Sequence, residues 1–391
     1  MTIVLEKNER VLIRVDFNVP VNSGVISDLS RIKSALPTIR HFLNLGMSVV
    51  LMSHFGRPTG IDANYSLKFL IKPLSKLLNQ NVLFSSDIRD LGVLNSIKSG
   101  DVLLLENLRF YSEEAQNDLV FAELLSKYGD IYVNDAFGTS HRQHASIQKI
   151  QEFFPSKSYM GFLLEKEVAE LQKIQKSSLA PQTVIVGGSK IGSKIHMLTT
   201  FLNKADNILI GGGMAFPFIK HMGGQIGASL CNNDEVEVVK NFLHQSAKSE
   251  TKIVLPIDCL VTDSISSKTN IKYSNIMSIP DGYMGVDIGV KSVQLFQKFI
   301  VNSKLILWNG PMGIFETQEF SSGTKEITKA VAEFTANSGY SLIGGGDTVS
   351  AISEFSQKNQ FSYISTGGGA MLDFFRNPNL PGVMGLKRII I

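Results

Sequence analysis

Two lysines, Lys190 and Lys194, stand four residues apart in a glycine-rich stretch, 183-TVIVGGSKIGSKIHML-198, that follows an apolar run. Ammonium groups beside glycine turns are suited to phosphate, because glycine lets the backbone approach an anion closely. The stretch is close to the phosphate-cradling pattern GxxxxGK[ST], but its last letters read Gly192-Ser193-Lys194 in place of Gly-Lys-Ser. A structural turn and a phosphate site of another kind both remain open. On a helix the two lysines would share one face, where bound phosphates would relieve their repulsion.

Four glycine clusters end apolar runs in the second half of the chain: VIVGGSK, LIGGGMA, LIGGGDT and ISTGGGA. One cluster alone usually marks a tight turn, but four at equivalent positions indicate a nucleotide or phosphate crevice. None matches GxGxxG, since Phe216 replaces the third glycine in 211-GGGMAF-216, so the dinucleotide fingerprint is absent. Asp347 is the best-placed carboxylate for Mg²⁺, and capping a helix is its alternative role. Glu316 could accept a hydrogen bond from a ribose hydroxyl or simply lie on the surface.

Polar and basic side chains follow the apolar runs of the first half. They are Asp16, Asn18, Arg31, His54, Arg57, Arg109, Asn134, Asp135, Arg142 and His144. In open α/β sheets, ligands bind beyond the carboxyl ends of the strands, so these side chains are expected to converge there. The planar fork of arginine binds carboxylate and phosphate oxygens bidentately. The pattern predicts a site for a multiply charged anion, although any single arginine could be solvated or ion-paired.

Short apolar runs alternate with helical patterns along the chain. Ten runs predict strands, at 11–17, 48–53, 101–106, 131–134, 183–186, 207–210, 252–256, 304–308, 340–343 and 361–365. Their continuous Val, Ile and Leu content is typical of strands that are covered on both faces. Apolar residues at helical spacing, followed by Gly46, predict a helix over 30–46. The alternation of strands and helices predicts parallel sheets in an open α/β architecture.

Length and arginine placement indicate two domains. A chain of 391 residues is of the right size for two. Eight of the ten arginines lie in residues 1–142, none lies in 143–375, and the remaining two are Arg376 and Arg388. Either this is chance, or the two halves have different electrostatic roles and the C-terminal segment returns to the first half. A helical pattern over 164–178 would connect them.

Composition excludes several classes of protein. Apolar residues make up 43% and charged residues 19%, which supports buried cores and argues against disorder. A net charge of +3 is too small to indicate a nucleic-acid or membrane partner. Two distant cysteines, Cys231 and Cys259, do not form a disulfide scaffold, and the histidines show no zinc spacing. The opening MTIVLEKNER does not resemble a secretory signal, so a cytoplasmic location is expected.

The chain resembles the phosphoglycerate kinase family. The motifs RVDFNVP, SHFGRP, LLENLRF, YVNDAFGTSHR, GFLLEKE, GGSKIGSK, IGGGMAF, WNGPMGIFE, GGGDT and STGGGA occur in the family's order, from about Arg14 to Gly369. The resemblance implies two doubly wound (Rossmann-like) parallel-sheet α/β domains joined by a hinge helix. It assigns 1–163, with the tail 376–391 folding back, to 3-phosphoglycerate, 164–178 to the hinge helix and 179–375 to the nucleotide.

The resemblance also implies the site residues. For 3-phosphoglycerate they are Asp16, Asn18, Arg31, His54, Phe55, Gly56, Arg57, Arg109 and Arg142. For ATP or ADP they are Lys194, Gly212, Gly213, Asn309, Glu316, Gly345, Gly346, Asp347 and Thr348, with Mg²⁺ on Asp347. Lys190 matches the lysine that follows the transferred phosphoryl group, so Lys190 and Arg31 are the expected catalytic pair. Ser189, Gly192-Ser193 and Val290 depart from the commonest family pattern, and none of them is an assigned residue.

The implied reaction is 1,3-bisphosphoglycerate + ADP ⇌ 3-phosphoglycerate + ATP, a step of glycolysis and gluconeogenesis. It would proceed by direct in-line transfer after hinge closure, in a monomer without nucleic-acid or membrane partners. Two alternative functions are less consistent with the sequence. An NAD-dependent dehydrogenase is disfavoured by the missing GxGxxG pattern. A non-catalytic anion- or nucleotide-binding module is disfavoured by the presence of Arg31, Lys190 and Asp347 together.

Overall fold

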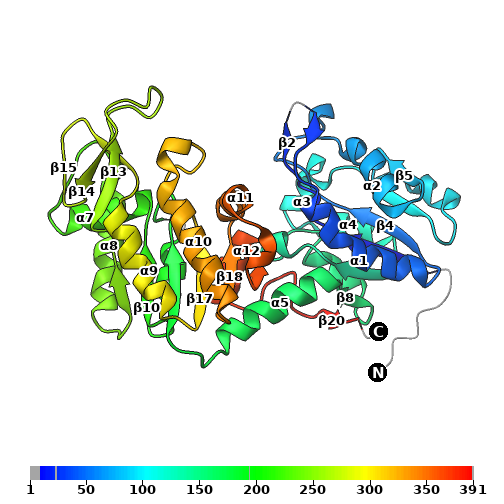
Figure 1. Ribbon diagram of the computed structural model, residues 1–391. Helices are drawn as coiled ribbons and strands as arrows, with labels where there is room; N and C mark the ends of the chain where they lie inside the picture. The colour runs from blue at the N-terminus through cyan, green and yellow to red at the C-terminus, as the bar shows by residue number, and fades with distance from the viewer. Residues whose placement is uncertain (1–8, 23, 193, 390–391) are drawn as a thin grey trace. The chain divides into compact units, whose positions relative to one another are not determined.

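The computed structural model describes residues 9–22, 24–192 and 194–389, which form two compact units (Figure 1). Unit 1 runs to Leu171 and includes the residues from Asn377 onward, while unit 2 is Gln172–Arg376. Helix α5 (Phe162–Gln175) begins in unit 1 and ends in unit 2, so the division falls within a helix. The ligand assigned to each half of the chain stays a prediction.

Unit 1 is built on a seven-stranded sheet in the order β20-β8-β7-β1-β4-β6-β5, in which every neighbouring pair is parallel. Its strands are β1 (Arg10–Arg14), β4 (Ser48–Met52), β5 (Val82–Ser85), β6 (Val102–Leu105), β7 (Ile131–Asn134), β8 (Ser158–Met160) and β20 (Lys387–Arg388). Besides α5, its helices are α1 (Ser30–Asn44), α2 (Ile71–Leu78), α3 (Ser112–Ala115) and α4 (Leu119–Ser126), and β2 (Val21–Asn22) and β3 (Val25–Ile26) form a separate hairpin.

The two faces of this sheet bury different side chains. Val11 and Ile13 of β1 pack in one cluster with residues of α1 and α2, whereas Leu12 packs in a second cluster with residues of α4. Successive residues of a strand point to opposite faces, so a strand that is apolar throughout requires helices on both sides. Unit 1 is therefore doubly wound, as the sequence predicts.

Unit 2 contains a six-stranded parallel sheet in the order β12-β10-β9-β17-β18-β19. Its strands are β9 (Gln182–Val186), β10 (Asn207–Ile210), β12 (Lys252–Val254), β17 (Leu305–Asn309), β18 (Tyr340–Gly344) and β19 (Tyr363–Ile364). The helices are α6 (Ile195–Phe201), α7 (Phe216–His221), α8 (Asn233–Ser246), α9 (Val290–Val301), α10 (Ser322–Ala336), α11 (Gly346–Phe355) and α12 (Gly368–Arg376). Ile185, Ile306 and Trp308 pack in one cluster with α9 and α10, which lie in front of the strands in Figure 1.

Two small sheets complete unit 2. β13 (Asp258–Thr262) pairs antiparallel with β14 (Lys272–Asn275) and with β16 (Met284–Ile288). β11 (Gln225–Ile226) pairs with β15 (Ser278–Ile279). No helix in the described part of the chain combines the length and apolar character needed to cross a membrane.

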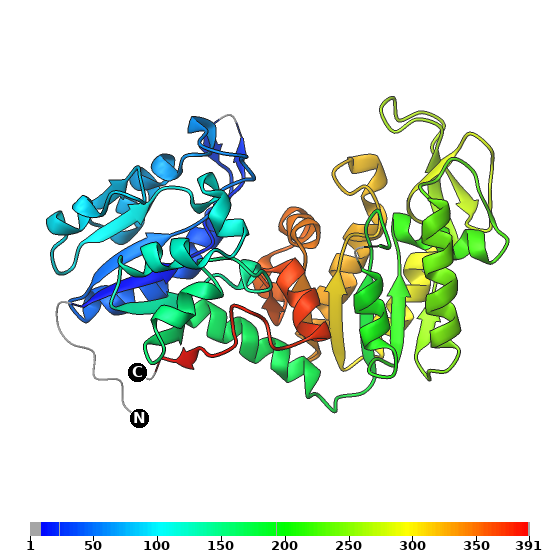
Figure 2. The same cartoon turned by 180° about the vertical axis from the view of Figure 1, so that it is seen from behind.

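All ten predicted strands are present, with ends shifted by a few residues, and the predicted helix over 30–46 is α1. Five strands of unit 1 were not predicted: β2 and β3 of the hairpin, and β5, β8 and β20 of the large sheet. The last of these comes from the end of the chain and pairs with β8 at the edge of the sheet (Figure 2). The segment that follows Asn377 thus supplies an edge strand to the sheet of unit 1.

Candidate active site

Arg31 and Asp16 form an ion pair at the carboxyl end of β1. Asp16 lies two residues beyond the strand, and Arg31 is the second residue of α1. His54, which follows β4, places its Nδ1 atom 4.0 Å from Asp16 Oδ1 and 3.3 Å from Nη2 of Arg14. Adjacent parallel strands therefore bring three predicted substrate residues into one chain of contacts.

Burial and the nearby arginines Arg14, Arg109 and Arg142 lower the pKa of His54 well below its usual value. Burial would raise the pKa of Asp16, but His54, Arg31 and Arg14 lower it below its usual range. His54 is thus neutral at neutral pH while Asp16 is ionised, so the ion pair of Asp16 is the one with Arg31. A neutral His54 can donate or accept a hydrogen bond at a substrate hydroxyl.

A second set of contacts fixes the loop after β4. Asn18 Oδ1 accepts the Gly56 N–H at 3.0 Å, and Arg109 Nη1 donates to the Gly56 carbonyl at 2.7 Å. The Phe55 ring lies against Phe69, with ring centroids 5.1 Å apart. Gly56 has φ +60°, and a Cβ there would lie 2.3 Å from the Tyr65 ring. The loop requires glycine at this position, and it connects Asn18 to Arg109.

Three predicted substrate arginines, Arg57, Arg109 and Arg142, line one cavity of about 650 Å³. Burial and the neighbouring arginines, Arg142 first among them, lower the pKa of Arg109 to about 10. Arg57 and Arg142 have no protein acceptor for their guanidinium groups among the residues that the structure describes. Guanidinium groups crowded together, two of them without a protein acceptor, produce a positive cavity, which favours an anion.

A buried network behind these residues was not predicted. Arg14 is fully buried, and its Nε donates to Ser146 Oγ at 3.0 Å. Ser146 Oγ donates to Glu114 Oε1 at 2.6 Å, and His144 Nδ1 lies 3.6 Å from the same carboxylate oxygen. Burial would raise the pKa of Glu114, but His144, Arg14 and Ser146 together lower it. An arginine inside the apolar strand pattern 11-VLIRVDF-17 is the sequence signal that would have revealed this network.

The expectation that Asn134 and Asp135 belong to the anion site is wrong, because both are fully buried and bind backbone groups. Asn134 Nδ2 donates to the Gly382 carbonyl at 2.7 Å. Asp135 Oδ1 accepts from the Leu163 and Leu164 N–H groups at 2.9 and 3.2 Å, which caps the first turn of α5. Burial raises the pKa of Asp135 to about 6. These two side chains hold the tail and the helix that leaves unit 1.

In unit 2, the four glycine turns follow strands of the six-stranded sheet and approach one another in two pairs. A Cβ at Gly212 would lie 2.8 Å from the Gly188 nitrogen, and one at Gly368 would lie 2.5 Å from the Gly345 Cα atom. Gly213 approaches Ser189 in the same way. The backbones of these turns therefore touch, which explains why the positions hold glycine.

The expectation that Lys190 and Lys194 share one helical face is wrong. Helix α6 begins at Ile195, after both lysines, and Lys194 is its N-cap residue. The Lys194 Nζ atom donates to the Gly187 carbonyl at 2.5 Å and to the Asn309 carbonyl at 3.3 Å. These bonds draw the lysine into the glycine turn, and burial lowers its pKa to about 8 although Asp347 acts to raise it.

Thr348 and Asn309 connect the ends of β17 and β18. Thr348 Oγ1 donates to the Gly344 carbonyl at 2.9 Å and accepts the Gly310 N–H at 2.6 Å. The Asn309 Nδ2 atom is buried and has no acceptor in the described residues. A buried donor without a partner is costly, so this amide is positioned to meet a ligand.

Asp347 is exposed in the first turn of α11, and the N-cap position is Gly345, so the helix-capping alternative is not observed. No group of three or more His, Cys, Asp or Glu side chains in the described parts of the chain could hold a metal. One exposed carboxylate suits Mg²⁺ only when nucleotide phosphates complete its coordination. Lys190 and Glu316 are exposed, and the Glu316 side chain has no hydrogen bond or ion pair with the other predicted nucleotide residues in the described structure.

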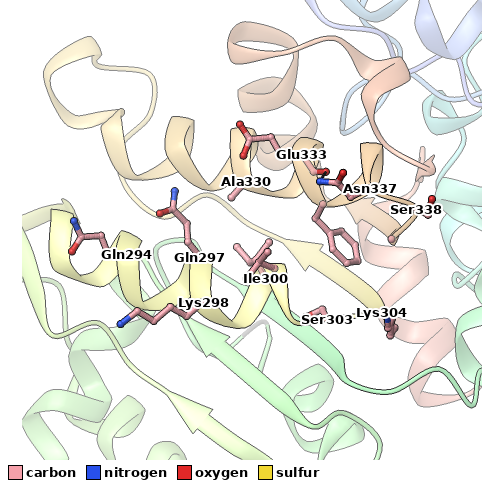
Figure 3. Close-up of a pocket in the computed structure, with 13 residues that line it drawn as sticks. Gln294, Gln297, Lys298, Ile300, Ser303, Lys304, Ala330, Glu333, Asn337 and Ser338 are labelled. Carbon is pink, nitrogen blue, oxygen red and sulfur yellow. Dashed lines mark hydrogen bonds between the residues drawn. The ribbon is translucent and has the colours of Figure 1, made fainter.

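Another cavity of unit 2, of about 690 Å³, lies between α9 and α10 (Figure 3). Ser303 and Lys304 before β17, and Ser338 and Gly339 before β18, line it. It therefore lies near the amino ends of these strands, away from the glycine turns, and includes none of the predicted site residues.

Comparison with known proteins assigns the family. The family model described as phosphoglycerate kinase matches residues 3–377. The chain belongs to the phosphoglycerate kinase family. The phosphoglycerate kinase of Thermosipho africanus is 44% identical over 385 residues, covering 97% of this chain and 95% of that protein. That of Nostoc punctiforme is 44% identical over 382 residues, with the same two coverages.

Solved phosphoglycerate kinases also share the fold. The structure from Coxiella burnetii has a TM-score of 0.85 and 36% identity, covering 97% of this chain and 96% of that chain. The Pyrococcus horikoshii enzyme has a TM-score of 0.81 and 32% identity, with the same coverage. The chain is thus a kinase of glycolysis with two α/β domains, and the dehydrogenase and non-catalytic interpretations are wrong.

Proposed function

We propose that unit 1 binds 3-phosphoglycerate or 1,3-bisphosphoglycerate, that unit 2 binds ADP or ATP, and that a phosphoryl group passes directly between them. The observation that carries the proposal is the cavity of unit 1, which Arg57, Arg109 and Arg142 line together. Asp16, Asn18 and His54 supply the hydrogen bonds for the hydroxyl and carboxyl groups of a three-carbon acid. Phe55 and Gly56 shape the loop that lies between these hydrogen-bonding residues and the arginines.

The nucleotide would lie along the glycine turns of unit 2. Lys194, Gly345, Gly346 and Thr348 would contact the phosphates, and Gly212, Gly213 and Asn309 would lie beside the nucleoside. Glu316 would accept from ribose. Asp347 would hold Mg²⁺ together with the phosphates, and the metal would neutralise part of their charge.

No protein nucleophile is needed. The oxygen–phosphorus bond at C1 of 1,3-bisphosphoglycerate breaks as a β-phosphate oxygen of ADP bonds to the same phosphorus, so the enzyme's task is positioning and charge stabilisation. Arg31 and Lys190 are proposed to contact the migrating group. They lie in different units, so the reaction requires closure about α5, which would also exclude water from the acyl phosphate.

Formation of an acyl phosphate from ATP and 3-phosphoglycerate tests the activity directly, with hydroxylamine to trap the product. We expect formation only when both substrates and Mg²⁺ are present, and loss of activity when a chelator removes the metal. Nucleotide binding without any acyl phosphate would contradict the proposal. The protein is expected to be cytoplasmic and monomeric, and sedimentation equilibrium checks the monomeric state.

Closure predicts a change in size in solution. 3-Phosphoglycerate with ADP is an unreactive pair, because ADP carries no γ-phosphoryl group, and it should fill both sites without turnover. Small-angle X-ray scattering is expected to show a smaller radius of gyration with both ligands than with either one alone. A radius that stays the same in the ternary complex would contradict closure.

The affinity for ADP is expected to fall as pH rises through about 8, since Lys194 loses its proton there. Its ammonium form, present below this pH, attracts phosphate, and the neutral form does not. The loss should be roughly tenfold by about pH 9, the size of one charge-assisted hydrogen bond. Titration calorimetry above about pH 7, where the ADP phosphates are already ionised, measures it. Lys194→Arg should abolish the pH dependence, and a persistent dependence in this variant would assign it to another group.

A further inference from the structure

The cavity of unit 1 extends beyond the arginines that the proposed function assigns to 3-phosphoglycerate. Thr59, Arg89, Tyr111 and Ser112 also line it, and we call the part that they line its outer part. A volume of about 650 Å³ falls in the range that holds drug-sized ligands, whereas the proposed substrates are three-carbon acids with one or two phosphate groups. The cavity thus has room for a larger anion, and its outer part has groups of its own.

Arg89 presents its charge to this outer part. Its guanidinium carbon lies 5.0 Å from the centre of the Tyr111 ring, and Nη2 donates to Glu113 Oε1 at 2.8 Å. Arg89 covers one face of the Tyr111 ring. A ligand that approaches this face therefore meets the guanidinium cation. Arginine has five N–H donors, and the bond to Glu113 uses one of them.

The balance of charge favours an anion in the outer part as well. Glu113 is the only carboxylate among the described residues that line the cavity, against four arginines. Arg89 is 59% exposed and Glu113 is 35% exposed at the side chain, and exposed pairs of this kind are weak. A phosphate group can therefore take up the remaining donors of Arg89 or displace Glu113, with the Thr59 and Ser112 hydroxyls beside it.

We propose that Arg89, with Tyr111 and the two hydroxyls, forms an outer anion subsite, so that the cavity accepts an elongated ligand with two or more phosphate groups. One phosphate group would occupy the inner arginines Arg57, Arg109 and Arg142, and a second would reach Arg89. Such a polyphosphate competes with 3-phosphoglycerate. The inference rests on the proposed function, because the inner arginines are assigned there.

Titration calorimetry without nucleotide or metal tests the subsite with orthophosphate, pyrophosphate and tripolyphosphate. In Arg89→Gln, we expect tripolyphosphate to bind about tenfold more weakly, the effect of losing one charge-assisted contact. Orthophosphate and 3-phosphoglycerate should change by less than about twofold. Glu113→Gln should strengthen tripolyphosphate binding, because the competing carboxylate is removed. Arg40→Gln, on the exposed side of α1, is the control and should change nothing.

The outcomes separate the two proposals. If 3-phosphoglycerate binds normally but Arg89→Gln leaves tripolyphosphate binding unchanged, the outer subsite is wrong and the substrate site stands. An equal loss for all ligands in Arg89→Gln would also overturn the subsite, since it would indicate a general effect on the fold. If the wild-type protein bound neither orthophosphate nor 3-phosphoglycerate, the inner site would be wrong, and the inference with it.

Discussion

Arg31→Lys is expected to lower kcat about a hundred- to a thousand-fold, the usual effect of removing one well-placed donor at a developing charge. Nη1 of Arg31 donates to Asp16, and this ion pair orients the other nitrogen atoms of the guanidinium group. A lysine has one nitrogen atom, so it cannot keep the bond to Asp16 and also present a fork to the migrating phosphoryl group. The dissociation constant of ADP should change by less than about twofold, because Arg31 belongs to the other unit.

Steady-state kinetics with a separate ADP titration distinguishes this role from a structural one. Lys190→Met, on the nucleotide side, should show a loss of kcat of the same order, whereas Arg40→Lys on the same helix as Arg31 should be normal. Near-normal turnover in Arg31→Lys would reject the role that we assign. A loss confined to the KM for 3-phosphoglycerate would make Arg31 a binding residue only.

Arg14→Met is expected to destabilise unit 1 by about 3–5 kcal/mol, because it removes one partner of a buried charged network. Arg14 is 0% exposed and Glu114 is 1% exposed, with Ser146 bridging them. Without the guanidinium, the Glu114 carboxylate stays buried with less compensation. Replacing Glu114 by Gln in the same variant should recover part of the loss, and Arg40→Met should cost less than about 0.5 kcal/mol.

The chain carries its own probe for this experiment. Trp308 is the single tryptophan, and it is fully buried in unit 2. Its fluorescence therefore reports the unfolding of unit 2, while far-ultraviolet circular dichroism reports both units. In Arg14→Met, urea should produce an earlier dichroism step with the fluorescence transition nearly unmoved. Coincident transitions at the wild-type urea concentration would show that the network contributes little.

The parallel sheets were predictable because their strands are apolar on both faces. A run such as 48-SVVLM-52 is buried at every position, and a short, continuously apolar segment of this kind is typical of a strand that is covered on both faces. The antiparallel strands β13, β14 and β16 were not predicted. β14 is mostly exposed and lacks this signal, whereas β13 is buried throughout but begins and ends with the polar residues Asp258 and Thr262. β8 and β20 are too short to be recognised without their neighbours, because their pairing joins segments more than 200 residues apart.

The candidate site was predictable where a residue follows a strand, as Asp16 and His54 do. Its supporting contacts were not, because they depend on which buried groups meet in space. Asn134 and Asp135 have the same sequence signal as Asp16, yet their side chains point inward to the tail and to α5. Lys194 has helical spacing to Lys190, but the Gly187 carbonyl bond holds it at the helix start. Sequence position identifies the strand end, and packing decides the direction of the side chain.

The pairing of β20 with β8 has a consequence for synthesis on the ribosome. About 200 residues separate Leu171 from Lys387, which corresponds to roughly 10–40 s of translation at about 5–20 residues per second. Throughout that interval the nascent chain exposes an unpaired β8 edge, because Gln172–Arg376 must be made before β20 is. An unpaired edge invites other strands to add to it. A message cut short just before codon 387 would release a protein with a complete unit 2 and a permanently open sheet in unit 1.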